Sequence, residues 1–277
     1  MRRRNSFSQV KARQKTDWTE PRLPTCAFQY NISTSEEQWM KFRYGITLCA
    51  IALSLSPAAA GARSPARPQP NLLTAAELAK GWRLLFDGST LQGWRNYRSK
   101  AILPGWRVEG NCLTLDGYGG DIITNETFEN FELSYEWRIS PGGNSGVFYN
   151  VVEGSNPKIW QTGPEMQVLD NDLSPDARNP THQAGAAYDL FAPRVRAVLP
   201  VGRFNKARII VNRGHVQHWL NGKLVVEYDL WSPAWRAAVA ASKFADLPGY
   251  GLARSGHIAL QDHGDRVWFR NIKVRRL

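Results

Sequence analysis

Residues 131–139 alternate apolar and polar side chains, and this alternation constrains the fold more than any other feature of the chain. Every second residue from Phe131 to Ile139 is apolar, and the residues between them are polar or charged. Successive side chains of a β-strand point to opposite faces, so the pattern predicts a strand with one buried face. Shorter strand patterns and turn residues alternate about every ten residues, a spacing typical of a β-sandwich.

The remaining pattern predicts an all-β domain with two short helices. We expect strands at 82–86, 106–115, 131–139, 147–152, 165–169, 208–212, 217–220, 224–228, 257–260 and 267–274. Asn221-Gly222 lies between two of them and is the strongest two-residue hairpin signal. Thr74 and Glu77 form a capping-box sequence that predicts a helix ending at Gly81. Ser232 precedes a proline and predicts a second helix, over 234–243.

The first sixty residues carry the pattern of an export signal. Lys41 and Arg43 follow Met40, an apolar run covers 46–55, and three alanines occupy 58–60. A basic start, a short apolar stretch and a small-residue end are typical of a secretory signal peptide, with a buried helix as the alternative. The run is too short to span a bilayer. We expect 1–39 to be a non-native or disordered upstream extension, 40–60 the signal peptide, 61–73 a linker and 74–277 the folded domain.

Charge and cysteine content narrow the classes of function. The chain has 35 Lys and Arg against 24 Asp and Glu. The first sixty residues hold nine of the basic residues and four of the acidic ones, so the expected mature chain is only mildly basic. We therefore expect no nucleic-acid partner. Cys112 is the one cysteine of the expected mature chain, which excludes an intrachain disulfide. We expect a bacterial protein, periplasmic or secreted, with no membrane association beyond the cleaved signal.

Polar side chains occur at the strand ends and turns of the predicted sandwich. They are Glu136, Arg138, Asn144, Glu165, Gln167, Asp170, His182, Tyr188, His218, Gln261 and His263. Taken singly, each has an ordinary structural alternative, such as an exposed ion pair between Glu136 and Arg138. Taken together, they favour a binding site on one sheet face. The eleven tryptophans would let such a site stack on sugar rings.

Six long segments, in order, resemble the 3-keto-disaccharide hydrolase domain family, which was long catalogued as a domain of unknown function. They are GWRLLFDGSTLQGW (81–94), FELSYEWRISPGGNSGVFY (131–149), GPEMQVLDND (163–172), HQAGAAYDL (182–190), HVQHWLNGKLVVEYD (215–229) and GHIALQDHGDRVWFRNIKV (256–274). The resemblance implies a concanavalin-like β-sandwich, or jelly roll, of two curved antiparallel sheets with a concave ligand face. It also implies an exported bacterial hydrolase that cleaves glycosides already oxidised at C3.

A ketone at C3 makes the C2 proton acidic, so the glycosidic bond can break by elimination across C2 and C1, followed by hydration. Such a reaction needs a base near C2, a group that stabilises the enolate oxygen and an acid for the leaving group. The acid and base candidates are Glu136, Glu165, His182 and His218, without individual assignment. Candidates for contacts to the enolate oxygen and the sugar hydroxyls are Arg138, Asn144, Gln167, Asp170, Tyr188, Gln261 and His263.

The sequence also leaves three alternatives open. A divalent metal ion, the one cofactor considered, could stabilise the enolate, with Glu165, Asp170 and His182 as candidate ligands at no known metal spacing. An ordinary glycosidase would use paired carboxylates, whereas here Gln167 places an amide between Glu165 and Asp170. A sugar-binding module would perform no chemistry. For the hydrolase, a sugar 3-oxidoreductase that makes the ketone is the expected functional partner.

Overall fold

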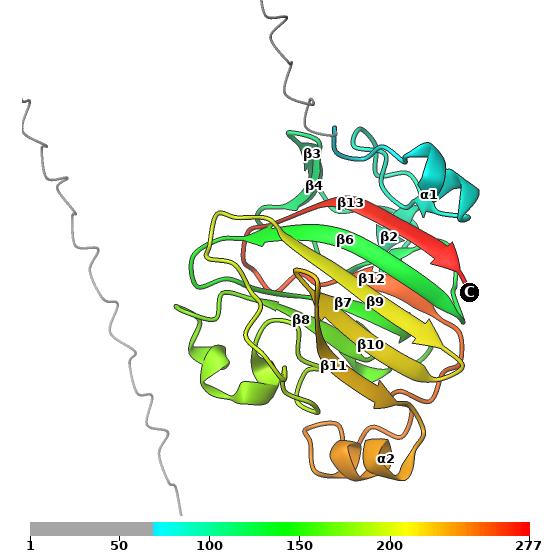
Figure 1. The fold of residues 1–277 in the computed structure, drawn as a ribbon, viewed down its shortest axis with the longest axis vertical. Coiled ribbons are helices and arrows are strands. Elements are labelled where there is room, and N and C mark those ends of the chain that lie inside the picture. Colours follow the sequence, from blue (N-terminus) through cyan, green and yellow to red (C-terminus); the bar gives the residue numbers. More distant parts are fainter. Residues whose placement is uncertain (1–68) are drawn as a thin grey trace, which may run out of the picture. The chain divides into compact units, whose positions relative to one another are not determined.

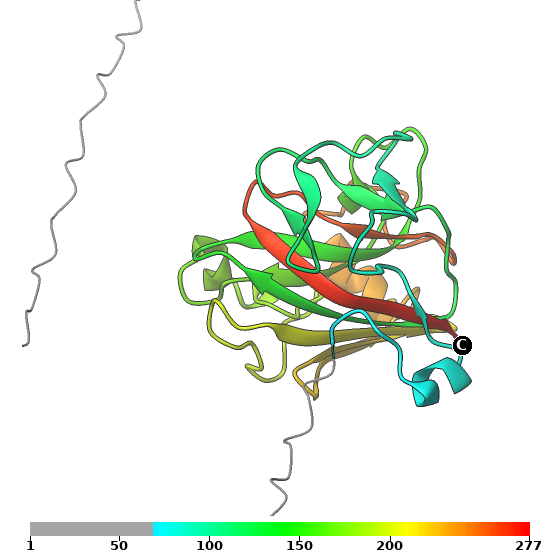
Figure 2. The same cartoon turned by 90° about the horizontal axis from the view of Figure 1, so that it is seen from above.

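The computed structural model describes residues 69–277, which form two antiparallel β-sheets packed face to face. In Figure 1 the strands β6, β9, β10, β11 and β13 lie across β7, β8 and β12, and Figure 2 shows the layers from above. The predicted all-β sandwich with short helices is confirmed. Within the described residues, no helix is long and apolar enough to cross a membrane.

The larger sheet has eight strands. Its order is β11-β10-β9-β6-β13-β4-β3, and β1 pairs with β13. The bounds are β1 Arg83–Leu84, β3 Trp106–Glu109, β4 Cys112–Leu115, β6 Phe131–Ile139, β9 Asn205–Asn212, β10 His215–Leu220, β11 Lys223–Asp229 and β13 Val267–Arg276. Neighbouring strands are antiparallel throughout, so hydrophobic alternation along each strand gives the sheet one apolar face and one polar face.

The smaller sheet has five strands in the order β2-β5-β12-β7-β8. The bounds are β2 Trp94–Asn96, β5 Ile122–Thr124, β7 Asn144–Val151, β8 Glu165–Leu169 and β12 His257–Leu260. The helices are α1 Ala75–Ala79, α2 Pro233–Ala240 and the 3₁₀ turns η1 Ile159–Gln161, η2 Pro175–Arg178 and η3 Pro180–His182. A small apolar cluster that includes Phe148 and Ile159 lies on the outer face of this sheet, so the segment carrying η1 packs there.

The main core lies between the two sheets. The predicted inner face of β6, including Tyr135 and Trp137, belongs to it, and so do Tyr149 of β7 and Met166 of β8. Each large apolar side chain buried in this way contributes roughly 1.5–3 kcal/mol to folding. Because Met166 faces inward, its neighbour Glu165 faces outward from the smaller sheet.

Predicted and observed strands agree best where the pattern is long or rich in branched residues. β6, β8 and β12 have the predicted bounds. The run 106–115 is instead a hairpin of β3 and β4, because Gly110 and Asn111 both adopt positive φ, 55° and 60°. The short strands β2 and β5 were not predicted, since three residues are too few to show alternation.

The folded domain begins before the predicted start at Thr74. Asn71 is only 3% exposed. Its backbone amide donates to Oδ1 of Asn271 at 2.6 Å, and the amide of Asn271 donates to Oδ1 of Asn71 at 2.7 Å. This reciprocal pair ties the segment before α1 to β13, so the end of the predicted linker is part of the fold. The predicted extension, the signal peptide and residues 61–68 of the linker lie outside the described residues.

Candidate active site

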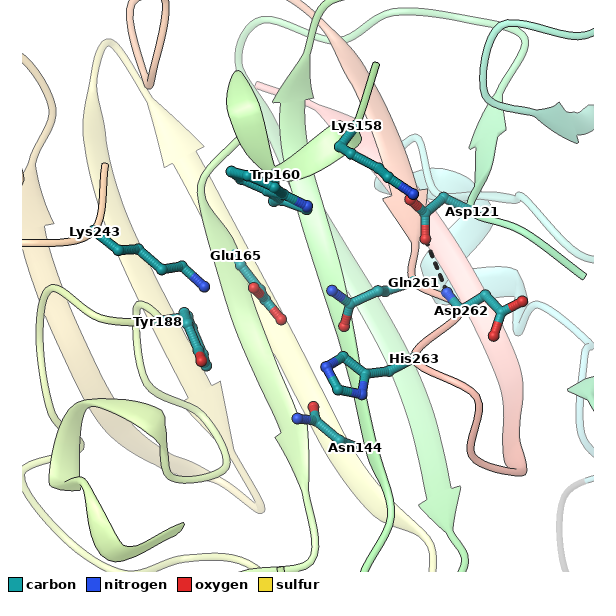
Figure 3. Close-up of a pocket in the computed structure, with 10 residues that line it drawn as sticks. All are labelled: Asp121, Asn144, Lys158, Trp160, Glu165, Tyr188, Lys243, Gln261, Asp262 and His263. Carbon is teal, nitrogen blue, oxygen red and sulfur yellow. Dashed lines mark hydrogen bonds between the residues drawn. The ribbon is translucent and has the colours of Figure 1, made fainter. Parts of the chain in front are cut away.

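A cavity of about 330 Å³ opens on the outer face of the five-stranded sheet. It is lined by Asp121, Asn144, Lys158, Trp160, Glu165, Tyr188, Lys243, Gln261, Asp262 and His263. The strands β7 and β8 and the end of β12 form its floor, and loops supply the rest, including both lysines (Figure 3). Three carboxyl side chains therefore share one cavity with two lysines. The carboxylate of Asp262 accepts backbone amides of Gly119, Gly120 and Gly264, which leaves Asp121 and Glu165 as the carboxyl groups that can act on a ligand.

Glu165 is the first residue of β8, and its carboxyl group lies in the middle of the cavity (Figure 3). The side chain is 5% exposed, and no hydrogen bond to its carboxyl group occurs among the described residues. Burial raises the pKa of Glu165 to about 8, against the opposing effect of Lys243. At neutral pH this carboxyl group therefore holds its proton and can donate it.

Gly146 of β7 makes room for that carboxyl group. A Cβ atom at this position would lie 2.0 Å from Oε1 of Glu165, well inside contact distance. Gly146 also pairs with Gln167 and accepts the amide of Gln261 at 3.0 Å, so it cannot move away without disturbing both neighbouring strands. The backbone at Gly146 thus fixes where the Glu165 side chain can lie.

Asp121 precedes β5, and its half-buried carboxyl group also lines the cavity. One of its oxygens accepts the backbone amide of Asp262 at 3.0 Å. Burial raises the pKa of Asp121 to about 6, while nearby Lys158 and His263 act to lower it. Asp121 is therefore ionised at pH 7 while Glu165 is protonated. Carboxyl groups whose environments push their pKa values apart in this way are typical of acid and base pairs.

The two lysines lie on opposite sides of the cavity. Lys158 points toward Asp121, and Lys243 lies beside Tyr188 and Glu165 (Figure 3). The ammonium of Lys243 is 4.1 Å from the centre of the Tyr188 ring, a cation–π contact that holds it over the cavity. Each carboxyl group thus has one cation nearby, and either cation could stabilise negative charge on a bound molecule.

Three buried amide atoms in or beside the cavity have no hydrogen-bond partner among residues 69–277. They are Oδ1 of Asn144, Nε2 of Gln167 and Oε1 of Gln261. Buried polar atoms are nearly always paired, because an unpaired one costs roughly 1–3 kcal/mol. Asn144 and Gln261 line the cavity, so their amide groups can offer donors and acceptors to a polar ligand such as a sugar.

The structure brings together six of the eleven residues predicted from the sequence. Asn144, Glu165, Tyr188, Gln261 and His263 line the cavity, and Gln167 lies beside Glu165 on the same face of β8. His182 lies behind this group rather than in it. Its ring stacks on Tyr188 at 4.2 Å, and its two nitrogens face Asp176 at 2.7 Å and Asp189 at 3.0 Å. His182 therefore positions Tyr188.

Glu136 and Arg138 were expected on the same surface as Glu165, and this expectation is wrong. Both lie on the outer face of β6, in the eight-stranded sheet, so the whole thickness of the sandwich separates them from the cavity. Glu136 accepts a hydrogen bond from Arg270 at 2.8 Å. The guanidinium of Arg138 lies 4.2 Å from the Trp268 ring centre. The alternation of apolar and polar residues correctly placed both side chains on the outer face of their strand, but it could not show to which of the two sheets that strand belongs.

His218 was also expected at the site and instead lies inside the sandwich. It faces inward from β10 and is fully buried. Its Nδ1 is 3.1 Å from the carbonyl of Gly185, an acceptor only, so Nδ1 carries the proton. Nε2 therefore accepts from the Tyr149 hydroxyl at 3.0 Å. Burial lowers the pKa of His218 to about 4, so the ring is neutral and serves the core.

The three predicted metal ligands do not fit a common ion. Both oxygens of Asp170 accept backbone amides, from Gly142 at 2.7 Å and Asp172 at 3.0 Å, so this side chain anchors a turn. His182 faces two other carboxylates, and Glu165 lies in the cavity without it. Among residues 69–277, no group of three or more His, Cys, Asp or Glu side chains is placed to hold a metal ion.

Sequence reasoning missed Asp121, Lys158 and Lys243. All three lie in loops, where side chains follow no period. One signal was present at Asp121, which follows two glycines and begins an apolar run at the start of β5. A charged residue that follows a Gly-Gly turn and directly precedes a strand lies at the end of that strand, where binding sites often form. For the two lysines the sequence offers no comparable signal.

One buried and one half-buried carboxyl group that share a cavity with two lysines and two amides on a β-sandwich are typical of an enzyme that acts on a polar ligand. A family model described as the 3-keto-alpha-glucoside-1,2-lyase-like domain matches residues 81–275. The chain belongs to this family, as the sequence resemblance predicted. It is accordingly a glycoside-bond hydrolase or lyase.

Individual relatives agree with the family. A 3-keto-disaccharide hydrolase of Bacteroides thetaiotaomicron is 38% identical over 231 residues, which cover 72% of this chain and 79% of that protein. A crystal structure of a candidate glycosyl hydrolase from Parabacteroides distasonis is 32% identical, with a TM-score of 0.72, and covers 76% of this chain and 100% of that one. A second structure from the same organism is 29% identical, with a TM-score of 0.56, over 71% and 99% of the two chains.

Proposed function

We propose that the protein cleaves the glycosidic bond of 3-keto-glycosides, with 3-keto-disaccharides as substrates, by elimination across C2 and C1 followed by addition of water. The observation that carries the proposal is one cavity in which the carboxyl groups of Asp121 and Glu165 lie with two lysines, and desolvation raises the pKa of both carboxyl groups, to about 6 and about 8. Its family and the name of the relative from Bacteroides thetaiotaomicron support the same substrate class.

The ketone determines what the two carboxyl groups can do. A base removes the C2 proton, and the electron pair of that C–H bond forms an enolate with the C3 oxygen. The enolate then reforms the ketone, a C1–C2 double bond appears, and the aglycone leaves with the electrons of the C1–O bond. Water adds to C1 and a proton returns to C2, which completes a net hydrolysis.

The protonation states give each group a role. Asp121 is ionised and acts as the base toward the C2 proton. Glu165 is protonated and donates to the C3 oxygen as negative charge develops there. The Lys243 ammonium, held over Tyr188, adds positive potential at the same place. The unpartnered amides of Asn144 and Gln261 hold the ring hydroxyls.

An ordinary glycosidase with a carboxylate nucleophile is the weaker proposal. Such enzymes of this fold carry paired carboxylates on one strand, and in β8 the position two residues from Glu165 is the amide Gln167. Asp170, the next carboxylate along the chain, is bound to the turn at Gly142 and does not line the cavity. Without a ketone, Glu165 would have no enolate to stabilise.

Deuterium incorporation separates the two chemistries. The wild-type protein is incubated in D₂O with 3-keto-trehalose and, in parallel, with trehalose. We expect cleavage of the keto sugar only, with one solvent deuterium at C2 of the released 3-keto-glucose. Free 3-keto-glucose kept with the protein for the same time corrects for exchange after release. Cleavage of trehalose at an equal rate, or a product without deuterium at C2, would overturn the proposal.

We propose further that the protein is exported and receives its substrate from a sugar 3-oxidoreductase. The basic, apolar and alanine-rich segments of 40–60 support export. The reaction class supports the partner, because a C3 hydroxyl must be oxidised before elimination can occur. Amino-terminal sequencing of the protein from fractionated cells tests export. A mature start near Gly61 in a periplasmic or secreted fraction is expected, and a cytoplasmic protein that retains 40–60 would contradict it.

A further inference from the structure

A second cavity of about 240 Å³ adjoins the first. It is lined by Asn96, Tyr97, Ser99, Leu103, Tyr118, Gly120, Asp121, Pro157 and Lys158. Asp121 and Lys158 line both cavities, so a molecule that occupies the two together must pass these two side chains. They are also the only charged groups of the second cavity, whereas the first holds further ionisable groups, including Glu165 and Lys243.

The side chains of the second cavity suit binding rather than chemistry. Tyr118 is 81% exposed and is the one fully exposed aromatic side chain among the described residues. A single exposed aromatic ring is ordinary on a protein surface, but Tyr118 lines a cavity that adjoins the first one. Tyr97 and Leu103 add apolar surface, while Asn96 and Ser99 add hydrogen-bonding groups. This mixture matches a sugar, whose C–H faces are apolar and whose rim is polar.

The wall that carries Tyr118 is rigidly held. The amides of Gly119 and Gly120 donate to one oxygen of Asp262, at 2.8 and 2.7 Å. On the other side, Nδ2 of Asn96 donates to the carbonyl of Gly119 at 2.6 Å. The same Asp262 donates its own amide to Asp121. The loop that presents the exposed ring is thus joined directly to the carboxyl group between the cavities.

The opposite wall is fixed as well. The Tyr97 hydroxyl donates to the carbonyl of Asn156 at 2.9 Å, two residues before Lys158. The ring of Tyr97 and the Lys158 backbone are therefore held in one arrangement. A site whose walls are already ordered binds without a large entropy cost.

We propose that this second cavity, with Tyr118 as its stacking platform, holds the leaving sugar of the disaccharide, so that the scissile bond lies beside Asp121 and Lys158. This inference rests on the proposed function. The order of groups along the substrate then matches the order along the protein. The C3 ketone lies near Glu165, C2 and C1 lie near Asp121, and the aglycone lies against Tyr118.

This placement completes the proton balance of the elimination. In an α-glucoside the C2 proton and the C1–O bond lie on opposite faces of the ring, so Asp121 takes the proton from C2 and the Lys158 ammonium gives one to the oxygen of the departing sugar as the C1–O bond breaks. When water adds to C1, its proton restores the Lys158 ammonium, and Asp121 returns a solvent-exchanged proton to C2. No further acid and no co-reactant besides water is required.

The test compares two α-glycosides that share the 3-keto-glucose ring, 3-keto-trehalose and methyl 3-keto-α-glucoside. Tyr118→Ala should lower kcat/KM for 3-keto-trehalose about tenfold, the value of one stacked ring. The same variant should cleave the methyl glycoside within about twofold of the wild-type rate. Leu252→Ala removes a side chain that is 61% exposed in a different cavity and should change neither rate.

Inhibition by glucose gives a second measurement. Free glucose, the leaving sugar of 3-keto-trehalose, should inhibit cleavage of the methyl glycoside in the wild type, and Tyr118→Ala should weaken that inhibition about tenfold. Equal losses on both substrates, or no loss on either, would overturn the subsite while leaving the proposed function intact. Failure of the wild-type protein to cleave either substrate would instead refute the proposed function.

Discussion

The outer faces of the two sheets both carry carboxyl side chains, but these are paired with arginines on one sheet and not on the other. On the eight-stranded sheet the carboxylates are paired with arginines, as Glu136 is with Arg270 and Glu132 is with both Arg208 and Arg275. On the five-stranded sheet, Glu165 has no hydrogen bond and Asp121 accepts only one, from a backbone amide. The difference shows that carboxylates paired with arginines belong to the scaffold, while carboxyl groups that have no arginine partner and line a cavity belong to the site.

The largest contrast is expected between Asp121→Asn and Glu136→Gln. Loss of the base should lower kcat/KM for 3-keto-trehalose by roughly 10²–10⁴-fold. The Glu136 change removes an ion pair on the opposite sheet and should leave the rate within about twofold. Steady-state kinetics on both purified variants decide the matter. A Glu136→Gln variant as impaired as Asp121→Asn would break the distinction between the two faces.

The next largest effect is expected at Gly146. Its replacement by alanine would place Cβ 2.0 Å from the present position of Glu165 Oε1, and the carboxyl group must move. A displacement of about 1 Å at a catalytic group can cost roughly 10²-fold. Gly154→Ala is the matched control, since its Cβ meets no atom within 4 Å. Circular dichroism should show both variants folded, and a Gly146→Ala variant at full activity would contradict the placement of Glu165.

The pH dependence sharpens the comparison further. We expect kcat/KM to fall below about pH 6, where Asp121 gains a proton, and above about pH 8, where Glu165 loses one. Each limb should approach a tenfold change per pH unit. Glu165→Gln cannot lose a proton, so it should remove the alkaline limb and retain the acidic one. A flat profile, or an alkaline limb that survives in this variant, would rule out the assignment.

The smallest predicted effect is on thermal stability. Removing the charge should stabilise the protein at Glu165, on the five-stranded sheet, and destabilise it at Glu136, on the eight-stranded sheet. The pKa of Glu165 is raised on folding, so the folded protein holds its proton more tightly and loses stability as pH rises from about 4.5 to 8. Glu165→Gln removes the cost of ionising a buried carboxyl group, so it should raise Tm, and more so toward pH 8. The expected rise is roughly 2–4 °C for each kcal/mol gained in the free energy of unfolding.

Glu136→Gln provides the contrast for that measurement. It breaks the ion pair with Arg270 and should lower stability slightly, by roughly 0–1 kcal/mol. Thermal melts of both variants at pH 5 and pH 8 test the two signs. A Glu165→Gln variant that melts below the wild type at pH 8 would show that the carboxyl group is a structural partner after all.

The sequence revealed local geometry better than long-range pairing. Alternation placed Glu136 on the outward face of its strand and put Glu165 and Gln167 on one face of theirs, and the structure has both arrangements. It could not show that β6 pairs with β9 and β13 while β8 pairs with β7, because pairing depends on contacts distant in sequence. His218 illustrates a related difficulty, since only the buried hydroxyl of Tyr149 explains a histidine on an inward face.

The loops were the least predictable part of the site. Lys158 and Lys243 come from segments 85 residues apart in sequence, and no period links them. Their convergence depends on how η1 and the segment after α2 fold back over β7 and β8. The family resemblance implied the fold and the class of reaction, whereas the proposed base, Asp121, became visible only with the cavity.

The reciprocal pair between Asn71 and Asn271 has a practical consequence for anyone trimming the protein. A recombinant chain that starts at Thr74 would lose both of those hydrogen bonds and a third, from Nδ2 of Asn71 to the carbonyl of Asn111 at 2.8 Å. The bulge of β13 around Asn271 would then fray from one edge. A chain that retains Asn71 keeps these hydrogen bonds, so the segment before α1 stays bound to β13 and is protected from exopeptidases.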